Sequence, residues 1–288
     1  MKTPSLFPAT PAPSRRRAFT LVEMLAVIAI LGILAAIAVP ALKNIGKNNI
    51  QTSATRQLLD AVARGRQLAL AHRTTVYMVF LPTNYWNINP NWWGTLSPGE
   101  KTQATNIVDR QLSGYAYLSY GQLGDQPGQH TWHYLTDWLA LPAGNFIPPA
   151  KFTSNGPAIS IPLWQSNSVY RSQSYSPIIP FNWTWAFPLP DENATNVLVN
   201  LPCLAFDYTG QLISEIAPNG VYQDAFIPMD QGNVSYGYDG PTKSLRLTPL
   251  AAKDITEIPP GNSTNIGFNV VHIERFTGRC TLETFQMP

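Results

Sequence analysis

The sequence predicts an α+β fold, in which one long N-terminal helix packs on a head of antiparallel β-strands that carries a large loop-rich insertion. Three observations lead to this prediction. An uninterrupted apolar run near the N-terminus passes directly into an amphipathic stretch. The 26 prolines and 19 glycines lie mostly after residue 80, which favours short strands joined by turns over a helical bundle. Later segments alternate in hydrophobicity around turn residues, as β-hairpins do.

Residues 1–39 combine a polar leader with an apolar segment. The leader begins with a stretch rich in Pro, Ser and Thr, which cannot bury enough surface to offset chain entropy, and continues through Arg15, Arg16 and Arg17. The segment 19–39 is apolar except for Glu23. Its length of about 31 Å in helical form suits a hydrocarbon core of about 30 Å. We therefore expect a cytoplasmic leader at 1–18 and a transmembrane helix at 19–39, and the arginines predict that the rest of the chain is extracytoplasmic.

The stretch 40–72 predicts an amphipathic continuation of the same helix. Small and apolar residues recur at steps of three and four, which is the spacing of one helical face: Ala54, Leu58, Ala61, Gly65 and Leu68. Polar residues occupy the opposite face. Pro40 lies at the junction, where it removes one backbone donor and should kink the helix rather than begin a new domain.

The remaining chain, 73–288, predicts a β-rich head. Thr74 to Leu81 is rich in β-branched and aromatic residues and indicates a first strand. Hairpins are predicted for 203–213, around the turn Asp207-Tyr208-Thr209-Gly210, and for 269–282. The irregular, Trp- and Pro-rich region 83–200 is interpreted as an insertion that the core does not need, since its flanks already supply a helix and antiparallel strands.

Glu23 is a carboxylate inside an apolar segment, and burying it without a partner would cost at least a few kcal/mol. If the chain is cut between Ala18 and Phe19, the new amino group of Phe19 is a cation at the same end of the helix. In an assembly of staggered parallel helices, the amine of one subunit can reach the carboxylate of another. Glu23 would then set the stagger between subunits.

The sequence RRRAFTLVEMLAVIAILGILAAIAVP, residues 15–40, resembles the cleavage and methylation segment of type IV prepilins and type II secretion pseudopilins. The resemblance implies cleavage between Ala18 and Phe19, N-methylation of Phe19, and assembly roles for Glu23 and Pro40. Ala18 stands where the family usually has glycine. The implied partners are a prepilin peptidase, other pilin or pseudopilin subunits and the inner membrane, with the head in the periplasm before the subunit enters a filament.

A second resemblance concerns the head. The segment RQLLDAVARGRQLALAHRTTVYMVF, the turn from Phe206 to Gly210 and the terminal FTGRCTLE are similar to the H-type minor pseudopilin. In that protein, a helix with an Ala-rich end precedes the first strand, and a Thr-Gly-Arg turn joins the last strand pair. The sequence thus favours a minor pilin or pseudopilin, which is a structural subunit and not an enzyme.

Two alternatives remain open. Ala36-Ile37-Ala38 follows an apolar run in the manner of a signal-peptidase site, and cleavage there would release a soluble head. The head would alternatively be a secreted or membrane-anchored carbohydrate-binding or adhesive module, in which exposed rings from NYWNINPNWWG (84–94, with Trp86, Trp92 and Trp93) and FNWTW (181–185) bind a sugar or another partner. The competing interpretation is that these large aromatic side chains fill a thin β-core.

The remaining motifs exclude several functions. A net charge of +2 with 12 % charged residues does not indicate a nucleic-acid partner. The sequence contains neither G-x-S-x-G, a P-loop nor H-E-x-x-H, and we expect no cofactor. His130 and His133 have the spacing of metal ligands, but the sequence suggests no third ligand, so no metal is expected. Cys203 and Cys280 would form a disulfide in an oxidising compartment or remain two buried thiols.

Overall fold

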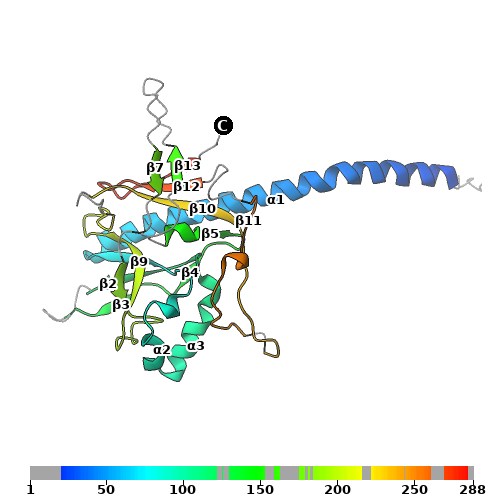
Figure 1. Cartoon of the computed structure of the whole chain (residues 1–288). Coiled ribbons are helices and arrows are strands. Elements are labelled where there is room, and N and C mark those ends of the chain that lie inside the picture. The colour runs from blue at the N-terminus through cyan, green and yellow to red at the C-terminus, as the bar shows by residue number, and fades with distance from the viewer. Residues whose placement is uncertain are drawn as a thin grey trace, which may run out of the picture. The chain divides into compact units, whose positions relative to one another are not determined.

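The computed structural model describes residues 21–121, 125, 130–152, 159–162, 175–178, 181, 184–215, 222–242, 244–260 and 269–284, and for 37–51, 159–162, 175–178 and 284 it describes the backbone alone. The chain divides into two compact units, residues 1–48 and 49–288. Helix α1 (Leu21–His72) contributes to both units (Figure 1). The second unit is the head, and its described strands pair antiparallel.

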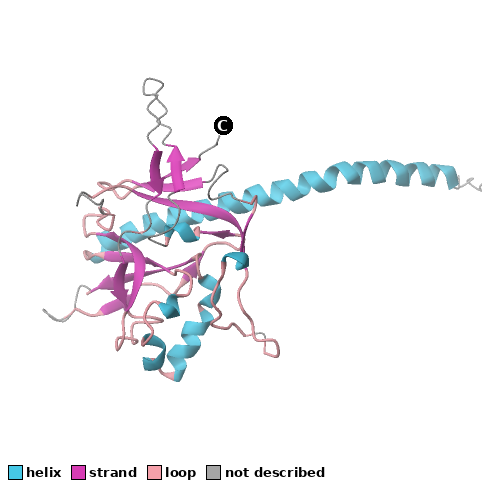
Figure 2. Cartoon of the chain, in the orientation of Figure 1, coloured by secondary structure: helices cyan, strands magenta, loops and turns pink. Residues whose placement is uncertain are grey.

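The described strands form three sheets (Figure 2). The first has six strands in the order β3-β2-β1-β9-β8, with β4 also paired to β2. Their bounds are β1 Val76–Phe80, β2 Gly114–Tyr120, β3 Trp132–Tyr134, β4 Leu139–Ala140, β8 Thr184–Phe187 and β9 Val199–Phe206. The second has the order β11-β10-β12-β13, with β5 also paired to β10: β5 Asn145–Phe146, β10 Ala225–Val234, β11 Ile255–Glu257, β12 Asn269–Ile273 and β13 Cys280–Thr284. Strands β6 (Ile159–Pro162) and β7 (Tyr175–Ile178) form a separate pair.

The amphipathic pattern of the helix is confirmed in the head. Ala54, Leu58, Ala61 and Gly65 are buried and Leu68 is half-buried, whereas the polar residues of the opposite face are exposed: Arg56, Asp60, Arg64 and Gln67. The buried face packs against both larger sheets, because one core cluster joins it to side chains of β1, β2, β9, β10 and β12. The predicted α+β fold, a helix followed by an antiparallel head, is therefore correct.

Gly65 explains how the helix comes so close to the first sheet. A β-carbon at this position would lie 3.2 Å from Cε1 of Tyr117 and 3.4 Å from Cε2 of Phe206, so a larger residue would push the rings away. The hydroxyl of Tyr117 donates to the carbonyl oxygen of Ala61 at 2.6 Å. This bond fixes the helix against β2 one turn before Gly65.

The other face of the first sheet is covered by the Trp-rich segment. Residues alternate along β1, so that Met78 and Phe80 face α1 while Val79 faces a second cluster. That cluster contains side chains from the short helices α2 (Trp92–Thr95) and α3 (Pro98–Asn106). Figure 2 shows the strand layer between α1 and these helices. Short 3₁₀ helices are found at Tyr85–Asn87, Val108–Arg110, Pro149–Lys151 and Ala252–Asp254.

Helix α3 has a local signal that our sequence analysis missed. Ser97 caps the helix, its hydroxyl accepts from the backbone N–H of Glu100, and the Glu100 carboxylate accepts from the backbone N–H of Ser97. Pro98 occupies the first turn. The hydrogen bonds from Ser97 lower the pKa of Glu100. Ser-x-x-Glu with a proline after the serine is a helix-start pattern that can be read from the sequence.

The interpretation of 83–200 as an insertion that the core does not need is wrong. Strand β2 comes from this region and pairs with β1 over five residue pairs, from Val76 with Ser119 to Phe80 with Tyr115. Tyr115 and Tyr117 belong to the core under α1. The region therefore supplies a strand adjacent to the first predicted strand, and without it β1 would lose one of its two neighbours. Its low periodicity reflects short strands separated by long connections.

Candidate assembly site

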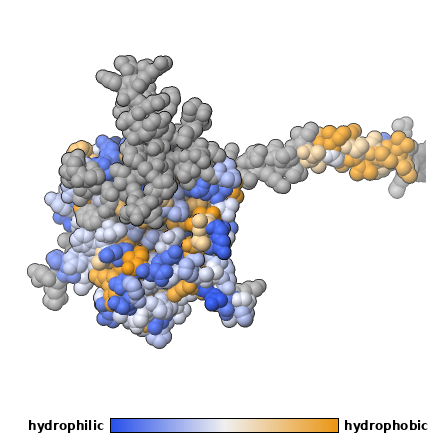
Figure 3. Space-filling model, viewed as in Figure 1, coloured by the Kyte–Doolittle hydropathy of each residue, from blue (hydrophilic) through white to orange (hydrophobic). Residues whose placement is uncertain are grey.

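The N-terminal part of α1 presents an uncovered apolar surface. Every side chain described from Leu21 to Ala36 is exposed, including Leu21 at 79 %, Ile28 at 65 % and Leu34 at 58 %. Because these exposed residues are consecutive, they cover every side of the helix, and Figure 3 shows the apolar colour along the face that it draws. A helix that is apolar on all sides requires an apolar environment, either lipid or other helices. The segment is therefore an interaction element.

Among the described residues 21–36, Glu23 is the one with an ionisable side chain, and this side chain is exposed. A carboxylate on an apolar helix limits the environments that the helix can enter, because transferring an ionised group out of water without a cation is costly. The predicted cleavage and methylation positions, Ala18 and Phe19, lie outside the described residues, as do Arg15, Arg16 and Arg17. Pro40 lies within α1, and its predicted kink stays a prediction.

Comparison with protein families identifies this region. Residues 13–39 match the model of the prokaryotic N-terminal methylation motif. Residues 13–39 are a prepilin-type cleavage and methylation signal. The prepilin-type signal ends at Val39, one residue before Pro40, and contains Ala18, Phe19 and Glu23. This signal supports a type IV pilin-like or pseudopilin-like protein, and it implies a prepilin peptidase and other pilin subunits as partners.

The prepilin-type signal and the architecture agree. An N-terminal helix followed by an antiparallel, sheet-rich head is a pilin-like arrangement. No curated protein and no solved structure gives a significant match to the chain, so the resemblance of the head to the H-type minor pseudopilin stays a prediction. Among the described residues, no helix meets both the length and the apolar character needed to span a membrane.

The segments that carry the H-type resemblance meet at the end of α1. Arg66 extends from the helix, and its Nε donates to the carbonyl oxygen of Thr277 at 2.7 Å. The same side chain lies against Gly210, in the predicted turn after β9, and against Gly278, in the last hairpin. Both glycines have positive φ, +82° and +61°, which other residues rarely adopt. The predicted hairpins around these turns are confirmed by the pairing of Phe206 with Leu212 and of β12 with β13.

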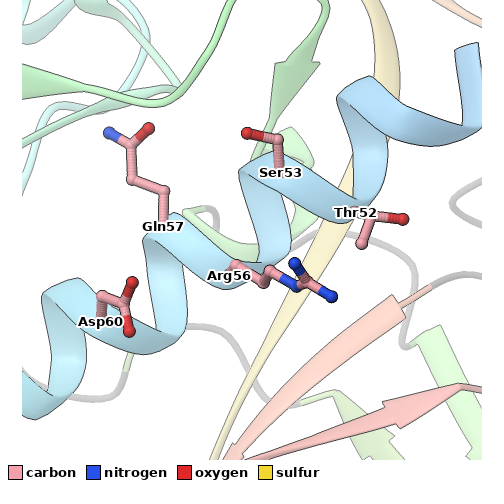
Figure 4. Close-up of a pocket in the computed structure, with 5 residues that line it drawn as sticks. All are labelled: Thr52, Ser53, Arg56, Gln57 and Asp60. Atoms are coloured by element: carbon pink, nitrogen blue, oxygen red, sulfur yellow. The ribbon is translucent and has the colours of Figure 1, made fainter. Parts of the chain in front are cut away.

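A polar groove runs along the exposed face of α1 within the head. It has a volume of about 480 Å³ and is lined by Thr52, Ser53, Arg56, Gln57 and Asp60. Figure 4 shows these side chains on successive turns of the helix. The amide of Gln57 donates to the carbonyl oxygen of Ala140 at 2.9 Å, which ties the groove to β4. The lining offers one guanidinium and one carboxylate, which suits contact with another polar surface.

The tryptophans predicted to bind a partner are mostly core residues, which corrects that prediction. Trp92 is fully buried, and its Nε1 donates to the carbonyl oxygen of Leu189 at 2.9 Å. Trp86 is also buried, and its ring lies edge-on to that of Tyr85. Trp93 is half-buried beneath the ammonium of Lys101, 5.9 Å from its ring centroid. The second face of the first sheet needs large apolar side chains, and these tryptophans provide them.

Cys203 and Cys280 are thiols in the structure rather than a disulfide. Cys203 is buried between the first sheet and the Trp-rich segment, whereas Cys280 packs against the cluster under α1. The Sγ of Cys280 donates to the carbonyl oxygen of Leu59 at 3.3 Å. Burial raises the pKa of both thiols. The two strands that contain them, β9 and β13, belong to different sheets, and the two thiols pack in different core clusters.

Several charged groups are buried in the head. Lys151 Nζ lies 4.0 Å from Glu215 Oε1, and both side chains are 2 % exposed. Burial lowers the pKa of Lys151, whose ammonium also lies 4.6 Å from the ring centroid of Phe181. Asp230 is fully buried, and its two carboxyl oxygens accept no hydrogen bond from the residues that the structure describes. Burial and, to a smaller extent, the negative charge of Glu257 raise the pKa of Asp230 to about 8. The carboxyl group is therefore mostly protonated at neutral pH.

The described histidines and acids do not form a metal centre. Within the part of the chain that the structure describes, no group of three or more His, Cys, Asp or Glu residues is placed to hold a metal ion. His133 Nε2 lies 3.3 Å from Asp125 Oδ2. His272 lies between two carboxylates, with Nδ1 at 2.8 Å from Glu283 and Nε2 at 2.9 Å from Asp224. These contacts connect neighbouring segments of the head.

Proposed function

We propose that the chain is a minor pilin or pseudopilin, a structural subunit of a type IV pilus or of a type II secretion-like filament. A prepilin peptidase removes residues 1–18, Phe19 becomes the N-methylated first residue, and the helix enters the filament. The observation that carries this proposal is the prepilin-type signal at 13–39, within which the described side chains of α1, from Leu21 to Ala36, form an uncovered apolar surface. The signal and the surface that enters the filament thus share one segment of the chain.

The apolar surface of α1 can be buried in two environments, first in lipid and then among other helices. Before assembly, lipid covers the side chains from Leu21 to Ala36, since each buried methylene favours the apolar phase by about 0.8 kcal/mol. After assembly, the helices of neighbouring subunits replace the lipid through close packing. Arg15, Arg16 and Arg17 retain the leader in the cytoplasm. The inner membrane then holds the helix once, and the head lies in the periplasm.

Glu23 supplies the specificity that an apolar surface lacks. Leu, Ile and Val side chains tolerate many axial offsets between two helices, but a carboxylate in an apolar setting favours the offset that brings it to a cation. The amino group of Phe19 in a neighbouring subunit is such a cation after cleavage. Pairing between Glu23 and this amine fixes the stagger of adjacent subunits.

The head would contact its neighbours through polar surfaces. The groove from Thr52 to Asp60 lies on the exposed face of α1, and it carries charges of both signs. A filament subunit needs such surfaces on its head as well as an apolar helix. We assign a minor rather than a major subunit because the chain devotes most of its length to an elaborated head, which a few copies in a filament accommodate more easily than a uniform array.

The experiment is intact-mass analysis of the protein isolated from membranes that contain a prepilin peptidase. The expected mass corresponds to a chain that begins at Phe19 and carries one additional methyl group. Ala18→Gly should be processed to the same product, whereas Ala18→Leu should remain unprocessed because a bulky side chain precedes the cut. A mass that begins at Val39 would indicate a signal peptide instead. A chain that begins at Met1 in the presence of an active peptidase would contradict the proposal.

A further inference from the structure

His272 lies between two carboxylates on the second sheet. Its Nδ1 lies 2.8 Å from Oε1 of Glu283, and its Nε2 lies 2.9 Å from Oδ2 of Asp224. His272 belongs to β12, Glu283 belongs to β13, and Asp224 directly precedes β10. Because β10, β12 and β13 are successive neighbours in the sheet, one imidazole joins three adjacent segments.

The strand register places these side chains on one face of the sheet. His272 lies opposite Phe226 of β10 and opposite Thr281 of β13, and Glu283, two residues after Thr281, points to the same side. Ile273, the next residue of β12, points the other way, into the core under α1. The ring of Phe226 stacks on the imidazole with a centroid distance of 4.5 Å and an interplanar angle of 13°. The imidazole is therefore held in a fixed orientation between its two acids.

The two carboxylates share the imidazole as their cation. Among the described residues, the ion pairs of Asp224 and of Glu283 are the ones with His272. The side chain of His272 is 23 % exposed, and those of Asp224 and Glu283 are 38 % and 33 % exposed. Solvent thus reaches the group, and His272 can exchange its proton without unfolding of the head.

Two further charged residues, Glu274 and Arg275, follow His272 along the chain. The carboxylate of Glu274 accepts from the hydroxyl of Thr277 at 2.6 Å. The backbone N–H of Arg275 donates to Oδ1 of Asp224 at 2.8 Å, whereas its guanidinium lies over two aromatic rings. Neither residue replaces the imidazole between the two carboxylates.

The protonation state of His272 decides how many of these hydrogen bonds form. An imidazolium carries a proton on both nitrogens and can donate to both carboxylates. A neutral imidazole donates through one nitrogen, and its other nitrogen presents a lone pair. When both carboxyl groups are ionised, this lone pair faces a negative oxygen and is repelled. Loss of the proton therefore replaces two attractive contacts by one attractive and one repulsive contact.

We propose that His272 is a proton-dependent clamp for β13. In the protonated form it holds β13 and the start of β10 against β12, and loss of the proton releases β13. Among the described strands, β13 is at the end of its sheet and pairs with β12 alone, and strands with few neighbours open most easily. Release would also remove the bond from Sγ of Cys280 to the carbonyl oxygen of Leu59, which connects β13 to α1. The clamp goes beyond the filament role proposed above and concerns the head alone.

The test is hydrogen exchange of the full-length protein in detergent micelles, measured by mass spectrometry at about pH 5 and about pH 8, the range in which histidines usually titrate. After correction for the intrinsic effect of pH on exchange, the amides of β13 should lose protection about tenfold or more at the higher pH, since a hydrogen bond to a charged group contributes about that factor. The amides of β9 are the internal reference, because global unfolding would expose both strands. They should change much less than those of β13.

His272→Gln should remove this pH dependence, because glutamine has no proton to lose in this range. Glu283→Gln is a second, milder variant. Its amide can accept from Nδ1 or donate to it, so a neutral imidazole keeps both contacts and the loss of protection should shrink. His72→Gln, at a half-buried histidine at the end of α1, is the matched control and should behave as the parent.

Three results would each overturn the proposal. The first is β13 protection in the parent that does not change between the two pH values. The second is a loss in His272→Gln or Glu283→Gln as large as in the parent; if His272→Gln does not fold, Glu283→Gln decides alone. The third is an equal loss of protection in β9 and β13.

Discussion

Gly278 of the last hairpin lies so close to Gly210 that a β-carbon on Gly278 would stand 2.1 Å from the carbonyl oxygen of Gly210. The two turns are separated widely in sequence, yet they form one junction with Arg66 of α1, whose Nε donates to Thr277 at 2.7 Å. The junction holds the helix, the end of the first sheet and the last hairpin of the second sheet together. It therefore stabilises the head at the point where α1 ends.

Gly278→Ala should destabilise the head strongly. The substitution places a β-carbon inside the van der Waals distance of a backbone oxygen and also strains a backbone with φ of +61°, so a loss of several kcal/mol is expected from two separate mechanisms. Denaturant unfolding of the full-length protein in micelles measures it. Gly240→Ala, where a β-carbon would meet open space, is the control. Similar unfolding midpoints for the two variants would contradict the proposed junction.

Trp92→Ala and Trp93→Ala should differ in their effects on stability. Trp92 is fully buried and hydrogen-bonded, so its truncation should cost about 3–5 kcal/mol. Trp93 is half-buried, and its truncation should cost about 1–2 kcal/mol, because solvent already reaches part of its ring and a smaller cavity results. The free energy of unfolding of each variant decides this. A Trp92→Ala variant with nearly the stability of the parent would show that the ring is not a core residue in solution.

Asp230 should make the head less stable as the pH rises from about 4 to 8. The unfolded chain ionises this carboxyl near its ordinary pKa of 3.8, whereas burial keeps the folded state protonated up to about 8. The contribution of Asp230 to the free energy of unfolding is thus fully present below pH 3.8 and is lost as the pH rises through about 8. In Asp230→Asn, the free energy of unfolding should fall less steeply with pH than in the parent, by up to about 1.4 kcal/mol per pH unit.

The measurement for Asp230 is the free energy of unfolding between pH 4 and pH 9. Asp60→Asn, at an exposed position on α1, controls for the loss of one carboxylate and should follow the parent curve. Parallel curves for Asp230→Asn and the parent would show that Asp230 is not protonated by burial.

Glu23→Ala should separate assembly from folding. The head core contains no contribution from residue 23 among its described members, so the melting temperature should not change. Incorporation into filaments should fall sharply, because the proposed pairing with the Phe19 amine is lost. Co-purification with filaments and thermal melting are measured on the same preparations. Asp109→Ala, which removes an exposed carboxylate of the head, is the control for assembly. Normal incorporation of Glu23→Ala would remove Glu23 from the register mechanism.

The sequence by itself determined the elements whose signals are local. The prepilin-type signal depends on a short contiguous stretch, and the amphipathic face from Ala54 to Gly65 repeats at helical spacing, so both could be identified without knowledge of their partners. The last hairpin was also predicted, since its turn residues lie between two alternating strands. The capping box at Ser97 is equally local, although it lies within a region whose other short elements have little periodicity.

Only the tertiary structure decided which aromatic residues are buried and which are exposed. Trp92 and Trp185 both lie in Trp-rich, loop-like sequence, yet Trp92 fills the space over the first sheet whereas Trp185 lies on its edge strand and remains partly exposed. Burial depends on neighbours that are distant in sequence, such as Leu189 for Trp92 and Tyr77 for Trp185. In the same way, β2 became part of the core only through its pairing with β1, because a strand from an aperiodic region is recognised by its partners rather than by its own pattern.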